Sequence, residues 1–124
     1  MNYTTFDFSR FTDLKYLEIG SNSFRSVETF IIDGMNSLVS LKIGEKSFTE
    51  SKNGAGSEYF KSFHIRNCES LESIEIGSLS FSDYAGEFEL VNLPFLKSIS
   101  FGEDGNLGFN FYNSSFVVRS MVFL

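Results

Sequence analysis

Cysteine, histidine, proline and tryptophan are almost missing from this sequence of 124 residues, which contains one Cys, one His, one Pro and no Trp. The lone cysteine, Cys68, has no partner for an intramolecular disulfide, so no disulfide framework exists within the chain. His64 has neither a second His nor a Cys near it in the pattern, which argues against a metal site. We therefore expect no metal and no cofactor, and we assign His64 a structural or surface role.

Long apolar runs and clusters of positive charge are missing as well. No stretch approaches the roughly 18 apolar residues of a membrane span, and the amino-terminal region carries charged side chains in place of the apolar core of a secretory signal. The net charge is −6 and the ten Lys and Arg are scattered, whereas binding to nucleic acid requires clustered basic residues. The sequence predicts neither a membrane span nor a nucleic-acid partner, and it leaves the cellular compartment open.

Phenylalanine, by contrast, occurs sixteen times, and its positions belong to an internal repeat. A phrase of the form LxxIxIGxxSF begins at Leu14, Leu38 and Leu71, and a degenerate version begins at Leu96. A second phrase lies between these copies and reads FIIDGMNS, FHIRNCES, FELVNLPF and FVVRSMVF, with FDFSRFTD as a partial unit near the start. We interpret residues 1–124 as a single domain of about four units.

The units differ in length. Their leading leucines stand at positions 14, 38, 71 and 96, so successive units begin 24, 33 and 25 residues apart. Lengths in the twenties are those of leucine-rich repeats. The longer unit contains an insertion at residues 50–58, whose Gly, Ser and Asn are typical of a surface loop.

Both phrases alternate apolar and polar residues, which is the pattern of a half-buried strand. No window has a helical period over three turns, so the sequence predicts a mostly β solenoid with two short parallel strands per turn and almost no helix. In the first phrase we expect Leu17, Ile19, Leu41, Ile43, Ile74, Ile76, Ile99 and Phe101 to point inward. In the second phrase we expect the same of Phe30, Ile32, Phe63, Ile65, Phe88, Leu90, Phe116 and Val118.

Glycine and phenylalanine recur just after the first strand of each unit. A glycine at a strand end indicates either a positive φ or a backbone approach too close for a Cβ atom. The glycines concerned are Gly20, Gly44, Gly77 and Gly102. The phenylalanines that follow are expected to form a stacked aromatic column in the interior, and they are Phe24, Phe48 and Phe81.

The phrases LESIEIGSLSF with NLPFLKSI, and LKIGEKSF with NCESLESI, resemble leucine-rich repeats of large multicopy families in protists and of related bacterial surface proteins. The resemblance covers about residues 6 to 124. It implies a recognition scaffold whose partners vary from one member to another. The chain departs from the usual plant and animal consensus because it lacks the LxxN step and has a second strand in place of a helix.

Four sites of possible chemistry have plainer interpretations. Cys68 occupies the position that Met35, Leu93 and Met121 fill in other units, which predicts a small core residue. Residues 103–106 lack the spaced carboxylates of a calcium loop. The glycosylation sequons at Asn2 and Asn113 are close to chance occurrence and leave glycosylation undecided.

The last loop is unusually aromatic. Its aromatic residues are expected to be exposed if the array stops there, and the alternative is terminal disorder or burial under a further unit. They are Phe109, Phe111, Tyr112 and Phe116.

Charged residues alternate in sign across neighbouring outward positions. Glu18, Lys42 and Glu75 form one such row, and Asp33 stands beside Arg66. We expect these to be cross-strand pairs that fix the register of the strands.

Two functions fit this organisation, and neither is enzymatic because the repeat brings no nucleophile, base and orienting group together. The first is a protein-interaction module that uses the outward positions of the first strands, which are Tyr16, Glu18, Ser40, Lys42, Ser73, Glu75, Ser98 and Ser100. The alternative is a structural protein that assembles with itself head to tail into filaments through uncapped ends. That interface would contain Phe6, Phe8, Met121, Val122, Phe123 and Leu124.

Overall fold

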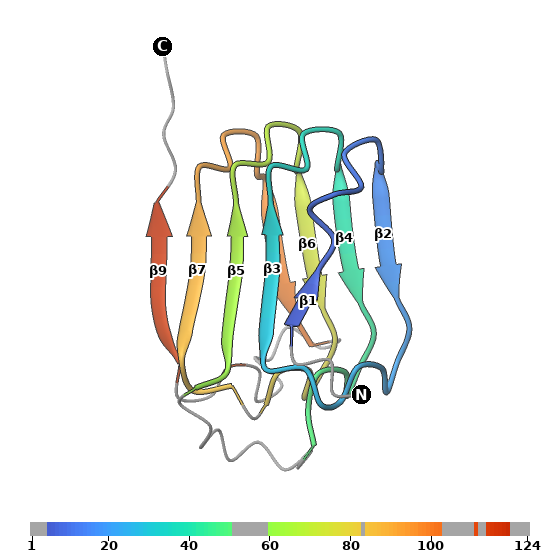
Figure 1. Ribbon diagram of the computed structural model, residues 1–124, viewed down its shortest axis with the longest axis vertical. Helices are drawn as coiled ribbons and strands as arrows, with labels where there is room; N and C mark the ends of the chain where they lie inside the picture. The colour runs from blue at the N-terminus through green and yellow to red at the C-terminus, as the bar shows by residue number, and fades with distance from the viewer. Residues whose placement is uncertain (1–4, 51–59, 83, 103–110, 112–113, 120–124) are drawn as a thin grey trace.

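The computed structural model describes residues 5–50, 60–82, 84–102, 111 and 114–119. Within these residues the chain forms nine β-strands and no helix, so no helix there is able to cross a membrane (Figure 1). The strands are β1 (Thr5–Asp7), β2 (Tyr16–Ile19), β3 (Thr29–Asp33), β4 (Ser40–Ile43), β5 (Ser62–Arg66), β6 (Ser73–Ile76), β7 (Glu87–Val91), β8 (Ser98–Phe101) and β9 (Ser115–Arg119).

The strands form two sheets, and the chain alternates between them. The odd-numbered strands make a five-stranded sheet in the order β1-β3-β5-β7-β9, and the even-numbered strands make a four-stranded sheet in the order β2-β4-β6-β8. Every pairing is parallel. Figure 1 shows the two sheets facing each other as layers. The expectation of a mostly β chain with parallel strands and without helix is confirmed for the described residues.

Equivalent positions of the repeat pair with one another across each sheet. Leu17 pairs with Leu41, Leu41 with Ile74, and Ile74 with Ile99. This register is strongly specified because a shift by one residue would turn every apolar side chain toward solvent. The parallel sheets therefore reproduce the repeat of the sequence position by position.

The core lies between the sheets and contains two columns of stacked phenylalanine rings. In the first column Phe6, Phe30, Phe63 and Phe88 have successive centroid distances of 5.0, 4.7 and 4.9 Å and lie within 5° of parallel. In the second, Phe24, Phe48, Phe81 and Phe111 have successive distances of 5.5, 4.6 and 4.9 Å. Rings of the two columns meet edge to face, as the quadrupoles of aromatic rings favour.

Two residues differ from the expected packing, and for a third the structure decides between the alternatives. Phe24 is 49% exposed because it stands at the end of its column, although Phe48 and Phe81 are fully buried. Phe111, for which exposure and burial were both open, is buried at 2% and stacks on Phe81 as the fourth member of the column. Val118 is 64% exposed because β9 is the last strand of its sheet and no later strand of the described chain covers its inner side.

The glycines at the strand ends are required by close approach. A Cβ atom on Gly44 would lie 2.6 Å from the amide nitrogen of Ser21, and one on Gly77 would lie 2.5 Å from that of Glu45. Gly20 meets only the Ser23 hydroxyl, at 4.0 Å, because β2 is at the edge of its sheet. Of the two explanations offered for these glycines, the close approach holds at Gly44 and Gly77, and the positive φ holds at Gly102, whose φ is 73°.

Positive φ angles also occur four residues after Gly44 and Gly77, at side chains that rarely accept them. Phe48 has a φ of 56° and Phe81 a φ of 60°. Both rings are fully buried in the second aromatic column. This left-handed backbone directs the rings back into the core, and their burial offsets the strain of the conformation.

The serine of the motif joins each unit to the one before it. The Ser80 hydroxyl donates a hydrogen bond to the Gly44 carbonyl at 2.6 Å and accepts one from the Ser47 amide at 3.0 Å. In the same way, the Ser47 hydroxyl donates to the Gly20 carbonyl at 2.9 Å and accepts from the Ser23 amide at 3.2 Å. In the two units that contain Gly44 and Gly77, the Gly-x-x-Ser-Phe sequence therefore provides a close approach, a hydrogen-bonded link and a core ring.

Candidate recognition groove on the four-stranded sheet

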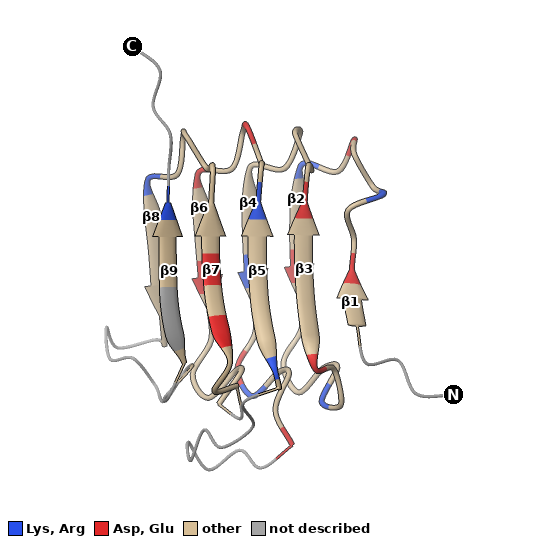
Figure 2. Ribbon diagram, turned by 60° about the vertical axis from the view of Figure 1, so that its left-hand side comes forward, with Lys and Arg blue, Asp and Glu red and all other residues tan. Residues whose placement is uncertain are grey.

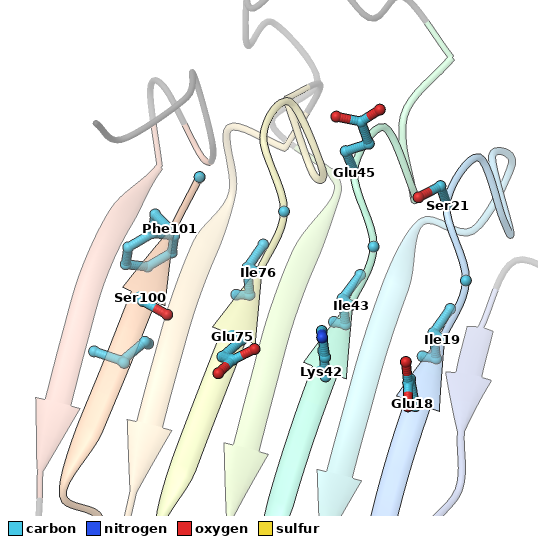
Figure 3. A pocket seen from close by; sticks show the side chains of 15 residues that line it. Glu18, Ile19, Ser21, Lys42, Ile43, Glu45, Glu75, Ile76, Ser100 and Phe101 are labelled. Atoms are coloured by element: carbon cyan, nitrogen blue, oxygen red, sulfur yellow. The ribbon is translucent and has the colours of Figure 1, made fainter. Parts of the chain in front are cut away.

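A groove of about 870 Å³ crosses the carboxyl ends of the four parallel strands β2, β4, β6 and β8. It is open to solvent along its length and is lined by the last residues of each strand and by the glycine that follows each one. Figure 3 shows these elements side by side, with the strand ends leading into the turns. The groove exists because all four strands run in the same direction and end at the same edge of the sheet.

One wall of the groove is a row of charged and polar side chains. Glu18 pairs in register with Lys42, Lys42 with Glu75, and Glu75 with Ser100. All four residues are exposed and line the groove (Figure 3). These are four of the eight positions that the sequence predicts as a partner-binding face.

The other four positions of that face lie outside the groove lining, toward the start of the same strands. Tyr16 is 68% exposed at the edge strand β2. Its register partners across the sheet are Ser40, Ser73 and Ser98. They form a flat row of mostly small hydroxyl side chains beside the charged row.

The charged residues of the groove are not engaged with one another. Among the described residues, no ion pair joins Glu18, Lys42 or Glu75 to any partner, although they are neighbours in register. The expected cross-strand pairing of this row is confirmed in register, and it forms without a salt bridge among the described residues. The strands are held in register by the apolar residues beneath.

The remaining residues that line the groove were not part of the partner-binding face predicted from sequence. It includes the backbone of the strand-end glycines, together with Ser21 and Glu45 from the turns (Figure 3). Gly44 and Gly77 have no side chain because the preceding unit occupies that space. The repeated glycine was the signal for this surface, since it marks the strand ends that line the groove.

The outer face of the five-stranded sheet carries a second charged cluster, on β5 and its neighbours (Figure 2). His64 Nδ1 lies 2.9 Å from Glu89 Oε1, and His64 Nε2 lies 3.0 Å from the Ser62 hydroxyl. Arg66 Nε donates to Glu89 Oε1 at 2.5 Å, and its guanidinium lies 3.8 Å from Asp33. The predicted proximity of Asp33 and Arg66 is confirmed, and both outward-facing charges are satisfied within the sheet.

Electrostatics in this cluster favour the ionised forms. Burial alone would raise the pKa of Glu89, but hydrogen bonds from Arg66 and His64 outweigh it and lower the pKa below its usual value. The hydrogen bond to Glu89 raises the pKa of Arg66. Both pKa shifts have the direction expected for an ion pair between Glu89 and Arg66 on neighbouring strands.

His64, Glu87 and Glu89 place three potential metal-ligand atoms within 4.8 Å of one another. Sequence reasoning looked for a second His or Cys near His64 and overlooked these carboxylates, which come from the adjacent strand β7. The Arg66 guanidinium already contacts Glu89, and a positive group at that position opposes a cation. The geometry is that of a satisfied polar network on the surface of the sheet.

Cys68 is fully buried, as are Met35 and, nearly so, Leu93, which hold the same position in neighbouring units. Burial raises the pKa of the Cys68 thiol, and the Sγ atom donates to the Arg66 carbonyl at 3.2 Å. A buried thiol with a raised pKa is a poor nucleophile. The prediction of a core role is confirmed.

The remaining predicted positions fall at the ends of the chain or outside the described residues. Phe6 is 5% exposed, and Phe8 packs against the same core. The insertion at 50–58 is described only at Glu50, which pairs with Lys61 at 3.1 Å. Asn2, residues 103–106, Phe109, Tyr112, Asn113, Met121, Val122, Phe123 and Leu124 lie outside the described residues, as does the side chain of Phe116.

Comparison of the chain with protein-family models, with curated proteins and with solved structures gives no match. A function for the protein is therefore inferred from the residues that line the groove.

Proposed function

We propose that the protein is a non-catalytic recognition module, built as a leucine-rich-repeat-like solenoid, that binds a protein partner in the groove of its four-stranded sheet. Support for the solenoid comes from the alternation of the chain between two parallel sheets with equivalent repeat positions in register. In such arrays neighbouring units supply each other's missing core, and one face remains for binding.

The difference between the two outer faces is the observation that carries the proposal. On the five-stranded sheet, His64, Arg66 and Glu89 hydrogen bond to one another. In the groove of the four-stranded sheet, Glu18, Lys42 and Glu75 are exposed and join no ion pair among the described residues. Charges left without partners on a hollowed surface are available to an incoming molecule, and charge complementarity gives such surfaces their specificity.

The arrangement of these groups favours binding over acid–base chemistry. The row presents side chains from successive strands, which are about 4.8 Å apart in a sheet. General acid–base catalysis requires groups that converge on one reacting atom, whereas Glu18, Lys42 and Glu75 extend side by side along one wall (Figure 3).

A random peptide library displayed on phage tests the proposal directly. The wild-type protein should enrich peptides that are not retained by Ser100→Tyr, which fills one end of the groove with a bulky side chain. Thr29→Tyr, an equivalent change on β3 of the opposite sheet, should retain the same peptides. Failure to enrich any peptide that distinguishes these two variants would overturn the recognition function.

A second function, head-to-tail self-assembly, is favoured by the edge of the molecule that contains β1 and β2. Phe24 and Tyr16 are 49% and 68% exposed there. A Cβ atom on Gly20 would have open space, while the equivalent atoms on Gly44 and Gly77 would collide with a neighbouring unit. This edge therefore resembles the interface between two successive units, with only one of the two units present.

Light scattering over a wide concentration range, followed by negative-stain microscopy, tests self-assembly. Filaments formed by the wild type should be lost in Gly20→Ala, because the new methyl group would occupy the space that a preceding unit needs, while the free protein remains folded. A wild type that stays monomeric at all concentrations, or filaments that persist in Gly20→Ala, would remove this function.

A further inference from the structure

The groove has a definite spacing of negative charge. Glu18 and Glu75 stand two strands apart in register, with Lys42 between them. Two strand intervals separate their backbones by about 9.5 Å. A chain in the polyproline II conformation advances about 3.1 Å per residue with three residues per turn, so side chains three positions apart point the same way about 9.3 Å apart. The two spacings agree.

The charge of the groove selects the sign of the occupant. Glu18, Glu45 and Glu75 line it against the single cation Lys42, and the whole chain has a net charge of −6. A basic ligand is therefore attracted at long range by the whole protein and at contact by the two carboxylates of the row. A Cβ atom on Gly20 would meet only the Ser23 hydroxyl, at 4.0 Å, so a main chain is able to lie close to the sheet at the end of β2.

We propose that the groove binds an extended basic segment of a partner protein in which two Lys or Arg residues stand three positions apart. One basic side chain pairs with Glu18 and the other with Glu75, and the two residues between them turn away from the sheet. This rests on the proposed recognition function and adds the chemistry of the partner to it. Lys42 lies between the two pairing sites, where it repels the basic ligand and so lowers its affinity for the groove.

The test is fluorescence anisotropy with three labelled proline-rich peptides of equal length. The first has two Arg residues three positions apart, the second has the same two Arg residues adjacent, and the third has Gln in both places. At near-physiological salt the first peptide should bind most tightly. Each of Glu18→Gln and Glu75→Gln should weaken it by roughly two- to fivefold, the range expected for an exposed ion pair.

Two further variants separate specific pairing from general charge. Lys42→Gln should strengthen binding of the first peptide by a similar factor, because it removes the repelling cation. Glu87→Gln makes the same change of net charge as the groove variants but on the outer face of β7, so it should leave the affinity unchanged.

Equal binding of the two arginine peptides, or an equal effect of Glu87→Gln and Glu18→Gln, would overturn the proposal by showing attraction to bulk charge alone. Failure of the proposed function looks different. Groove-dependent library peptides without paired basic residues would leave recognition standing and refute the basic segment. A library with no groove-dependent peptide would refute both.

Discussion

The amide nitrogen of Glu45 lies 2.5 Å from the point that a Cβ atom on Gly77 would occupy. Glu45 follows the glycine of the preceding unit, so this one contact joins two successive copies of the repeat. The same relationship holds between Gly44 and Ser21, at 2.6 Å. At Gly20 the corresponding space is open.

Gly77→Ala should therefore lower the free energy of unfolding by about 1–3 kcal/mol or more, because the added methyl group forces the backbones of two units apart. Gly77 does not have a positive φ, so the effect would report the collision alone. Gly20→Ala should stay within about 0.5 kcal/mol of the wild type. Urea denaturation followed by circular dichroism measures both, and equal midpoints for the two variants would contradict the close-approach explanation.

The serine of the motif should be most important where it joins two units. Ser80→Ala removes a hydroxyl that bonds both the Gly44 carbonyl and the Ser47 amide, which should cost about 1–3 kcal/mol because the partners are left unsatisfied. In Ser23→Ala only a 3.4 Å contact to the Ser21 carbonyl is lost, so a much smaller change is expected. Thermal unfolding of the two variants gives the comparison.

The interior and the exposed end of the second aromatic column should differ in their contribution to stability. Phe81 is fully buried between Phe48 and Phe111, so Phe81→Ala should cost about 3–5 kcal/mol through lost burial and an unfilled cavity. Phe24 is 49% exposed, and Phe24→Ala should cost clearly less. A Phe24 variant as damaging as the Phe81 variant in urea unfolding would mean that Phe24 is covered in solution.

Acid should remove the contribution of Glu89 to stability. Hydrogen bonds from Arg66 and His64 lower its folded-state pKa below the ordinary value of 4.5, so the ionised carboxylate stabilises the fold at neutral pH. This contribution is present above the ordinary pKa and is lost as the pH falls through the lowered one. Glu89→Gln should therefore be less stable than the wild type at pH 7, with the gap closing in strong acid.

Glu75→Gln is the control for the pH series, because Glu75 joins no ion pair among the described residues. Its stability should differ little from that of the wild type across the same range. A Glu89→Gln gap that stays constant from neutral to acid pH would show that the carboxylate contributes only through packing.

The strands were predictable from sequence because their alternation is strict. Leu41 and Ile43 are buried on one side of β4, while Lys42 between them is exposed. Cys68 was correctly placed in the core because Met35 and Leu93 hold the same position in other units. The first prediction depends on a pattern of a few residues, and the second depends on the regular spacing of the repeat.

The fourth member of the second aromatic column was not predictable in that way. Phe48 stands four residues after Gly44, but Phe111 stands nine residues after Gly102. Without the usual spacing, only the fold shows that Phe111 stacks on Phe81. A sequence pattern based on spacing does not identify Phe111, because its distance in sequence from Gly102 differs although its ring occupies the equivalent position in the column.

The groove was predicted only in part for a related reason. Alternation identified Glu18, Lys42 and Glu75 as outward neighbours, and the register confirms this. Whether such neighbours also form a salt bridge depends on side-chain direction, which the sequence does not give, and none forms among the described residues. His64 and Glu89 do make a side-chain contact, between strands 25 positions apart in the chain.

The contact between a glycine and the turn of the preceding unit also bears on where the chain accommodates extra residues. Ser47 and Ser80 make the same two hydrogen bonds at successive interfaces between units. Their units begin 24 and 33 residues after the units before them. Nine added residues between the motifs therefore leave the interface and the strand register unchanged.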